Sequence, residues 1–327
     1  MYELNDKLKE KVIGLNHSLK KKYDGVLNLT SSQLRKFIEN HIGEIQSMKK
    51  LENRELAIFE TKGGIVGVDG STNRMGGSYP HFIEVYQALA KSTINQEPLL
   101  LADIYSPLYL DQEENSLEDE DDIREDKRNV KLSTIEVEAA LESIDKFKPY
   151  AILMDGGLIR YNIYAYDKWI ELREKCEEEG ILLVGVIKDI KTSTIGDQLR
   201  ENYPDIGESF YDREMLFGLL DYGEIILIED EVNKKKPEGY SSVFLRSALS
   251  PAVIGMDIID SQKEYIKEMA NLVFTLTPEN SRGVPLWLDI VDKEVKISDE
   301  LMKNLMEEYM DRSIYERFFV SERDKRD

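Results

Sequence analysis

Two short apolar segments, each ending in Asp-Gly, constrain most strongly what this 327-residue chain folds into. The first, Ile65 to Val68, is rich in β-branched residues, which favours a buried strand over a helix. Asp69 follows at the end of this strand, and Gly70-Ser71 predicts a turn. The second segment, Ala151 to Met154, ends in Asp155-Gly156-Gly157. Both segments therefore predict a strand that ends in a carboxylate.

If these strands are neighbours in one sheet, Asp69 and Asp155 meet at one edge of it. Two carboxylates held close together repel each other and raise each other's pKa unless a cation neutralises them. Carboxylate oxygens are hard ligands and suit Mg²⁺ or Mn²⁺. The pattern therefore predicts a divalent-metal site. A simpler interpretation is that each Asp only begins a turn.

The net charge of −21 argues against broad electrostatic binding of nucleic acid, because phosphate contacts need an excess of Lys and Arg. It does not exclude a nucleic-acid enzyme whose site is locally positive through bound metal. The acidic segment from Asp111 to Asp126 predicts a solvated loop.

The single cysteine, Cys176, excludes an internal disulfide and fits a reducing compartment, so we expect a cytoplasmic protein and a structural role for this residue.

The N-terminal part of the chain predicts helices. Residues 1–22 and 31–52 have amphipathic patterns, and Ser31 or Ser32 is a suitable N-cap for the second helix. The charged N-terminus does not have the pattern of a signal peptide. No apolar run reaches the roughly 18 residues that a membrane-spanning helix requires, so we expect no membrane segment.

The central part predicts a mixed sheet. Gly64–Val68, His81–Val85 and Leu99–Tyr105 are expected to form an antiparallel meander. A helix at 131–147 places Val137, Leu141 and Ile144 on one face, with Glu138 on that same face and Glu136 pointing elsewhere. A glutamate on the inward face needs a reason, because a buried unpaired charge is costly. The alternative is that Glu138 lies at the margin of the face and reaches water.

A parallel pair of strands is predicted next. The order strand 150–154, helix 162–179 and strand 181–187 indicates a right-handed crossover. Lys188 directly follows the second strand and Lys191 is nearby, so both are placed to contact a phosphate. An ordinary solvated strand end is the alternative for Lys188.

The remaining predicted elements are helices near 195–201 and 212–221, strands near 223–229 and 241–247, an apolar run at Ala252–Ile258, a helix at Lys263–Phe274 and a final helix from about Asp299 to Phe319.

The order and spacing of these motifs resemble the NurA nuclease domain from about residue 60 to residue 300. The matching segments are Val68–Ser71, the acidic helix with Glu138, Leu153–Leu158, Gly185–Lys188 and Gly283–Ser298. The resemblance implies an α/β fold with an RNase H-like mixed sheet flanked by helices. It also implies a Mn²⁺- or Mg²⁺-dependent DNA nuclease, which works as a homodimer beneath a hexameric HerA-type ATPase that pumps DNA into it.

Carried over position by position, the resemblance makes Asp69, Glu138 and Asp155 metal ligands, and Lys188 a DNA contact. We also expect Ser71, Arg74 and Lys191 to contact nucleic acid. Two cations roughly 3.5–4 Å apart would activate water and stabilise the leaving oxygen, so no histidine base is needed.

One departure from the family concerns the last of the matching segments, Gly283–Ser298, which we call the late motif. Family members often carry a histidine near its end. This chain has Asp292 there, and its histidines, His17, His41 and His81, all lie early. We predict that Asp292 takes the fourth acidic position, since a carboxylate binds a hard cation directly. Asp289 is the competitor. The two side chains share a face if this segment is helical and point to opposite sides if it is a strand.

These expectations define three parts of the chain: an N-terminal helical extension at 1–55, a nuclease domain at 56–300 with an acidic insertion at 111–127, and a C-terminal helix and tail at 301–327. Alternative functions are a non-catalytic scaffold of an ATPase complex, an actin-like small-molecule kinase and an RNase. The sequence does not distinguish endonuclease from exonuclease, the polarity of strand cleavage, or repair from defence.

Overall fold

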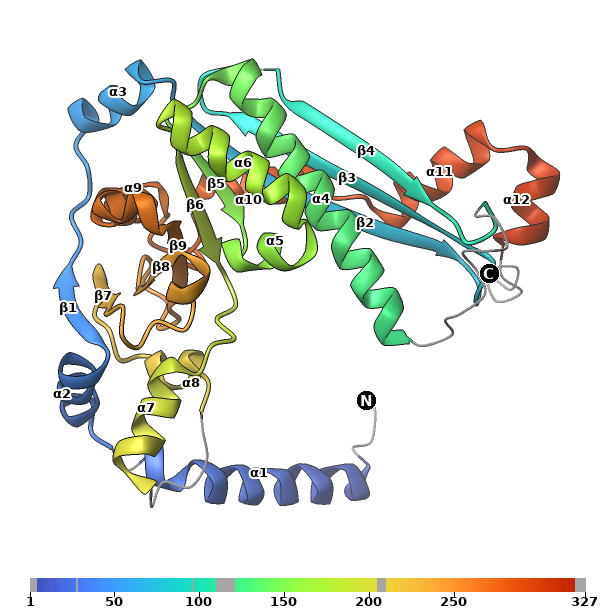
Figure 1. Cartoon of the computed structure of the whole chain (residues 1–327). Helices are drawn as coiled ribbons and strands as arrows, with labels where there is room; N and C mark the ends of the chain where they lie inside the picture. Colours follow the sequence, from blue (N-terminus) through green and yellow to red (C-terminus); the bar gives the residue numbers. More distant parts are fainter. Residues whose placement is uncertain (1–4, 28, 96, 110–120, 205–209, 321–327) are drawn as a thin grey trace.

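The computed structural model describes residues 5–27, 29–95, 97–109, 121–204 and 210–320. A nine-stranded sheet in the order β1-β7-β8-β9-β6-β5-β2-β3-β4 forms its centre (Figure 1). The strands are β1 (Gly43–Ser47), β2 (Ile65–Gly76), β3 (Phe82–Ser92), β4 (Leu99–Tyr105), β5 (Ala151–Asp155), β6 (Leu182–Ile187), β7 (Glu224–Ile228), β8 (Tyr240–Leu245) and β9 (Ile254–Ile259). This arrangement confirms the predicted fold class, a mixed RNase H-like sheet flanked by helices.

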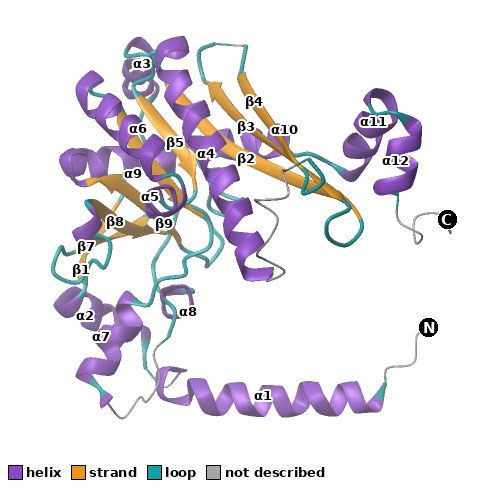
Figure 2. Cartoon of the chain, turned by 45° about the vertical axis from the view of Figure 1, so that its right-hand side comes forward, coloured by secondary structure: helices purple, strands orange, loops and turns teal. Residues whose placement is uncertain are grey.

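Helices cover both faces of the sheet, and further helices extend beyond it. They are α1 (Asp6–Leu27), α2 (Ser31–His41), α3 (Asn53–Thr61), α4 (Asp121–Phe147), α5 (Leu158–Tyr164), α6 (Tyr166–Glu179), α7 (Thr194–Asn202), α8 (Asp212–Leu216), η2 (Lys236–Glu238), η3 (Asp260–Tyr265), α9 (Ile266–Leu276), α10 (Leu286–Val295), α11 (Asp299–Tyr309) and α12 (Arg312–Phe318). One core lies between the sheet and α4, α5 and α6. A second lies between the opposite face and α9 and α10 (Figure 2). Within the described ranges, no helix is long and apolar enough to cross a membrane.

The antiparallel meander of β2, β3 and β4 is confirmed. The turn predicted at Gly70-Ser71 is wrong, because β2 continues in register with β3 to Gly76. Its parallel neighbour β5 stops much earlier, and the last paired residues are Val68 and Met154. Beyond Val68, β2 therefore has a strand on one side only. Asp69 lies at an open edge because the neighbouring strand β5 ends there, whereas its own strand β2 continues.

The parallel pair of β5 and β6 is also confirmed. The predicted helix between them begins earlier and is divided at Ala165 into α5 and α6, and α6 ends at Gly180 in a left-handed conformation, as glycine favours. The helix predicted near 212–221 is shorter, since α8 ends at Leu216. Cys176 is buried in the core against α4 and α5, which fits its structural interpretation.

The N-terminal prediction is wrong between residues 43 and 52. The second helix ends at His41, and β1 then joins the edge of the sheet beside β7. A Cβ at Gly43 would lie 1.9 Å from the carbonyl oxygen of Leu227, so only glycine permits this pairing. The N-cap of α2 is Thr30, one residue before the predicted Ser31, and it forms a capping box with Gln33.

Two helical parts extend beyond the sheet. α1 projects alone from the side of the molecule that carries α7 and α8, whereas α11 and α12 pack near the far end of β2 and β3 (Figures 1 and 2). The final helix was predicted as one element, but it is interrupted at Met310, and Asp311 caps α12. Of the acidic segment predicted as a loop, residues 111–120 lie outside the described residues, and residues 121–126 begin α4.

Candidate metal centre

Strand periodicity brings the two Asp-Gly motifs together. Side chains alternate between the two faces of a sheet, so Asp69 lies on the same face as Ile65, and Asp155 on the same face as Leu153. Both Ile65 and Leu153 belong to the core beneath α9 and α10. Since β2 and β5 are parallel neighbours, the two carboxylates meet at the carboxyl end of β5 on the face that carries α10.

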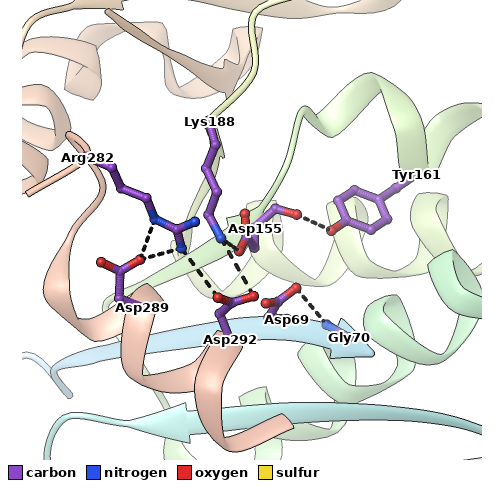
Figure 3. Close-up of polar contacts among 8 residues, drawn as sticks. All are labelled: Asp69, Gly70, Asp155, Tyr161, Lys188, Arg282, Asp289 and Asp292. Carbon is purple, nitrogen blue, oxygen red and sulfur yellow. Dashed lines mark hydrogen bonds and ion pairs between the residues drawn. The ribbon is translucent and has the colours of Figure 1, made fainter. Parts of the chain in front are cut away.

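Helix α10 supplies the third carboxylate. Asp69, Asp155 and Asp292 each have a carboxylate oxygen within 4.8 Å of the others (Figure 3). Asp69 is 8% exposed, whereas the side chain of Asp292 is 48% exposed. The cluster is therefore closed at the sheet and open beside α10, where a substrate would approach.

Two cationic side chains contact this cluster. The ammonium group of Lys188, just beyond β6, donates a hydrogen bond to Oδ2 of Asp155 and lies 3.9 Å from Oδ1 of Asp292. Arg282 donates to Asp289 at 2.7 Å and to Asp292 at 3.3 Å (Figure 3). Asp289 and Asp292 share a face because both lie on helix α10. Of the two, Asp292 lies with Asp69 and Asp155.

The acidic residue of α4 near the cluster is Glu136, and the predicted orientation of this helix is wrong. Glu136 is 1% exposed, and its charge acts on Asp69. Glu138 is only partly buried and interacts with Lys168 on α6. Residues two apart on a helix point about 200° apart, so both cannot face the cluster.

Small residues explain why α4 turns Glu136 inward. The side facing the sheet includes the fully buried Ser133, Ala140 and Ser143, which let the helix approach closely. Gly70 of β2 completes the fit, since a Cβ there would lie 2.5 Å from Oε1 of Glu136. These small residues recur at helical spacing, and this pattern in the sequence marks the face of α4 that packs on the sheet, which includes Glu136. The prediction considered only the large apolar residues of the helix and therefore chose Glu138.

Burial and mutual repulsion raise the pKa values of these carboxyl groups. Desolvation, followed by the charges of Asp155 and Glu136, raises the pKa of Asp69 from its ordinary value of 3.8 to about 9. Desolvation also raises the pKa of Asp155, against the opposing effect of Lys188. The pKa of Glu136 is raised by burial, and Arg160 opposes this shift. Lys188 and Arg160 therefore do not fully neutralise the acidic groups of the metal-free site.

A pH dependence of stability follows. Between about pH 4 and pH 9 the folded protein keeps a proton on Asp69 that the unfolded chain releases, so stability falls as the pH rises. We expect the melting temperature in EDTA to decrease over this range. The decrease should be smaller in Asp69→Asn and in wild type with Mn²⁺, because the amide or the cation replaces the proton. Thermal melts at several pH values test this, and equal slopes in all three samples would contradict it.

The residues present fit Mn²⁺ or Mg²⁺. Oε2 of Glu136 is buried and has no hydrogen-bond partner among the described residues, while Oε1 accepts a hydrogen bond from Arg160 at 3.3 Å. A buried carboxylate oxygen without a partner is costly unless a cation binds it. Asp69, Asp155 and Asp292 form an all-oxygen set of the kind that hard divalent cations prefer, and the carboxylate of Glu136 lies close enough to act on Asp69 and Asp155.

A basic cavity adjoins the cluster. It has a volume of about 480 Å³, and its floor is formed by β6, β8 and β9. The cationic side chains of its lining are Arg160, Lys188, Lys191, Lys234 and Lys235. Of these, sequence reasoning identified only Lys188 and Lys191, because the other three come from α5 and from the segment before β8, which no local motif connects to Asp155.

The other two predicted nucleic-acid contacts lie further along β2. Ser71 is on the same face as Asp69, and its hydroxyl accepts a hydrogen bond from the backbone NH of Ile297 at 3.1 Å. Arg74 points to the opposite face and lies about 17 Å along the strand from Asp69. Its guanidinium stacks 3.7 Å from the ring centre of Phe82. The structure therefore does not bring Arg74 to the metal centre.

The late motif yields a matched pair of variants. We expect Asp292→Asn to lower metal affinity and cleavage strongly, because it removes a carboxylate of the cluster. Asp289→Asn should have a much smaller effect, since Asp289 binds Arg282 and not the cluster. Manganese titration and cleavage rates of both variants test this. An inactive Asp289→Asn beside a normal Asp292→Asn would assign the ligand to Asp289.

Comparison with known proteins agrees with this geometry. The chain matches the NurA domain family over residues 63–297. No curated protein sequence matches it. Among solved structures, the NurA nuclease from Sulfolobus solfataricus is similar, with 14% identity, a TM-score of 0.58 and coverage of 93% of this chain and 96% of that one.

Two further NurA structures are also similar. A NurA with manganese has 12% identity and a TM-score of 0.53, covering 93% of this chain and 99% of that one. A NurA bound to dAMP and manganese has 10% identity and a TM-score of 0.50, covering 94% of this chain and 98% of that one. At such identities these likenesses show the fold alone, and the match over most of the sequence shows the family. The chain belongs to the NurA domain family.

Proposed function

We propose that this protein is a DNA nuclease that depends on Mn²⁺ or Mg²⁺. The observation that carries the proposal is the cluster of Asp69, Asp155 and Asp292, whose carboxylate oxygens lie within 4.8 Å of one another at the open edge of β2. Family membership favours a nuclease over an actin-like kinase. The NurA structures with manganese and with dAMP support the choice of metal and of a deoxynucleotide substrate.

In this proposal each residue has a distinct role. Asp69, Asp155, Asp292 and Glu136 hold the metal, which when bound activates water for attack on the phosphodiester. Arg160 donates a hydrogen bond to Oε1 of Glu136, and the buried Oε2, which has no partner among the described residues, is left for the metal. The exposed ammonium of Lys191, on the rim of the cavity, meets the phosphate backbone. Arg160, Lys234 and Lys235 each have a carboxylate partner, so bound metal would supply much of the positive charge that offsets the repulsion between DNA and a chain of net charge −21.

The deciding experiment is incubation of the purified protein with linear single-stranded DNA, double-stranded DNA and RNA, each with Mn²⁺, Mg²⁺ or EDTA. We expect cleavage of DNA with metal and none in EDTA. Cleavage of RNA in place of DNA would reassign the substrate. Intact DNA under all conditions, together with tight binding to an ATPase, would instead identify a scaffold.

We also propose that the protein forms a homodimer in the cytoplasm and binds a HerA-like hexameric ATPase. The exposed side chains of Leu8, Val12, Leu15 and Leu19 on α1 support a helical docking surface. Their spacing of four, three and four residues is that of a coiled-coil seam, and the lone position of α1 leaves this seam open (Figure 2). A partner that delivers DNA would compensate for the acidic surface of the nuclease.

A substitution in the seam tests this docking surface. Leu15→Asp should reduce co-elution with a HerA-like ATPase, because it places a charge at the centre of the seam. Ile13→Asp is the matched control, since Ile13 is 49% exposed on α1 but lies off the seam. Gel filtration of each mixture measures binding, and sedimentation of the nuclease alone measures dimerisation. Equal co-elution of both variants would exclude the seam.

A further inference from the structure

Lys188 contacts two carboxylates of the proposed metal centre. Its ammonium group bonds to Oδ2 of Asp155 and is 3.9 Å from Oδ1 of Asp292, so it connects two of the three clustered carboxylates (Figure 3). It also opposes the rise in the pKa of Asp69. In the metal-free protein, Lys188 therefore supplies positive charge to the group of carboxylates that would bind a metal.

The same side chain also borders the basic cavity. Lys188 lines it together with Lys234 and Lys235. Lys235 is held by both oxygens of the buried Asp257 at 2.8 and 2.7 Å, and Lys234 is held by Asp197. These two lysines have carboxylate partners outside the metal cluster. The partners of Lys188, in contrast, are carboxylates that a bound metal would take over.

We propose that Lys188 is a displaceable cation: it holds Asp155 and Asp292 together until metal binds, and its ammonium then moves into the adjoining cavity to bind a DNA phosphate. This inference rests on the proposed metal centre. A divalent cation and an ammonium group repel each other when they share carboxylates a few ångströms apart. The long, flexible stem of lysine lets the charge move while the backbone stays fixed at the end of β6. Metal binding and DNA binding would thereby be linked.

Manganese affinity provides the first test. Free Mn²⁺ is followed by electron paramagnetic resonance during titration of the metal-free wild type, Lys188→Met and Lys191→Met, without DNA. Lys188→Met should bind Mn²⁺ about tenfold more tightly, because the competing ammonium is gone. Lys191→Met is the control for loss of one positive charge in the cavity and should bind Mn²⁺ like wild type. Lys188→Arg keeps the charge and should show no gain.

The outcomes separate the two proposals. If wild type binds no Mn²⁺, the metal centre itself is wrong. If wild type binds Mn²⁺ and Lys188→Met binds it equally or more weakly, Lys188 organises the ligands or is neutral, and the displacement is wrong. Circular dichroism of each variant confirms that the fold is intact before the affinities are compared.

DNA affinity provides the second test. Binding of a fluorescent single-stranded oligonucleotide with phosphorothioate linkages is measured by anisotropy with EDTA and with Mn²⁺. Mn²⁺ should strengthen binding in wild type, and the gain should be at least about threefold smaller in Lys188→Met, which has no ammonium to release. The same gain in both proteins would show that Lys188 does not carry charge from the metal centre to the DNA.

Discussion

DNA cleavage is expected to fall by about a thousandfold or more in Asp155→Asn, the change with the largest effect that the structure predicts. The metal would supply several kcal/mol of transition-state stabilisation, which corresponds to a rate factor of this size. An amide at residue 155 lacks the charge to hold the cation, and Asp155 lies at the centre of the cluster, between β2 and β6. Cleavage of a linear duplex with Mn²⁺ measures the loss.

Asp69→Asn should be equally inactive and also provides a control for folding. The carboxyl of Asp69 is buried among other acidic groups and must bind a proton when the metal-free protein folds near pH 8, a cost that a neutral amide does not have. We expect Asp69→Asn to melt at a higher temperature than wild type in EDTA near pH 8. Normal cleavage by both variants would exclude the metal centre, whatever their stability.

The second large effect distinguishes two glutamates of one helix. Glu136→Gln should reduce cleavage by about a hundredfold or more, because it removes a buried carboxylate next to Asp69 that would bind the metal. Glu138→Gln makes the same chemical change two residues away, on a partly exposed side of α4 near Lys168. It should leave the rate within about twofold of wild type, since surface ion pairs contribute little.

This pair of variants is a strict comparison because helix, charge change and size of the side chain are the same in both. Initial rates at saturating Mn²⁺ are measured first, and the dependence on Mn²⁺ concentration second. Loss of activity in Glu138→Gln with normal Glu136→Gln would show that α4 rotates in the active protein and that the original assignment of Glu138 was right.

The sequence predicted those parts of the molecule that depend on local patterns. The strands around Asp69 and Asp155 are short, β-rich and apolar, so their periodicity is clear, and the parallel order of β5 and β6 follows from the helix between them. Asp292 was placed by the family resemblance, at the position where members often carry a histidine. The structure brings it to Asp69 and Asp155 through a helix, a packing that no local pattern specifies.

The parts that were mispredicted depend on contacts between distant segments. Glu136 faces inward because small residues on α4 meet Gly70, which lies over 60 residues earlier in the chain. Residues 43–47 form a strand because β7 offers an unpaired edge, although their sequence continues the pattern of α2. Arg74 was expected to contact nucleic acid, but β2 continues past the turn predicted at Gly70-Ser71 and carries Arg74 away from the cluster.

Gly70 has a consequence for the cohesion of the protein. A sheet normally separates the layers on its two sides, but here Glu136 reaches from the α4 layer past a residue without a side chain, while Asp292 reaches from the α10 layer. A cation bound by both would connect the two layers through the sheet. Metal binding would then also join the two sides of the fold.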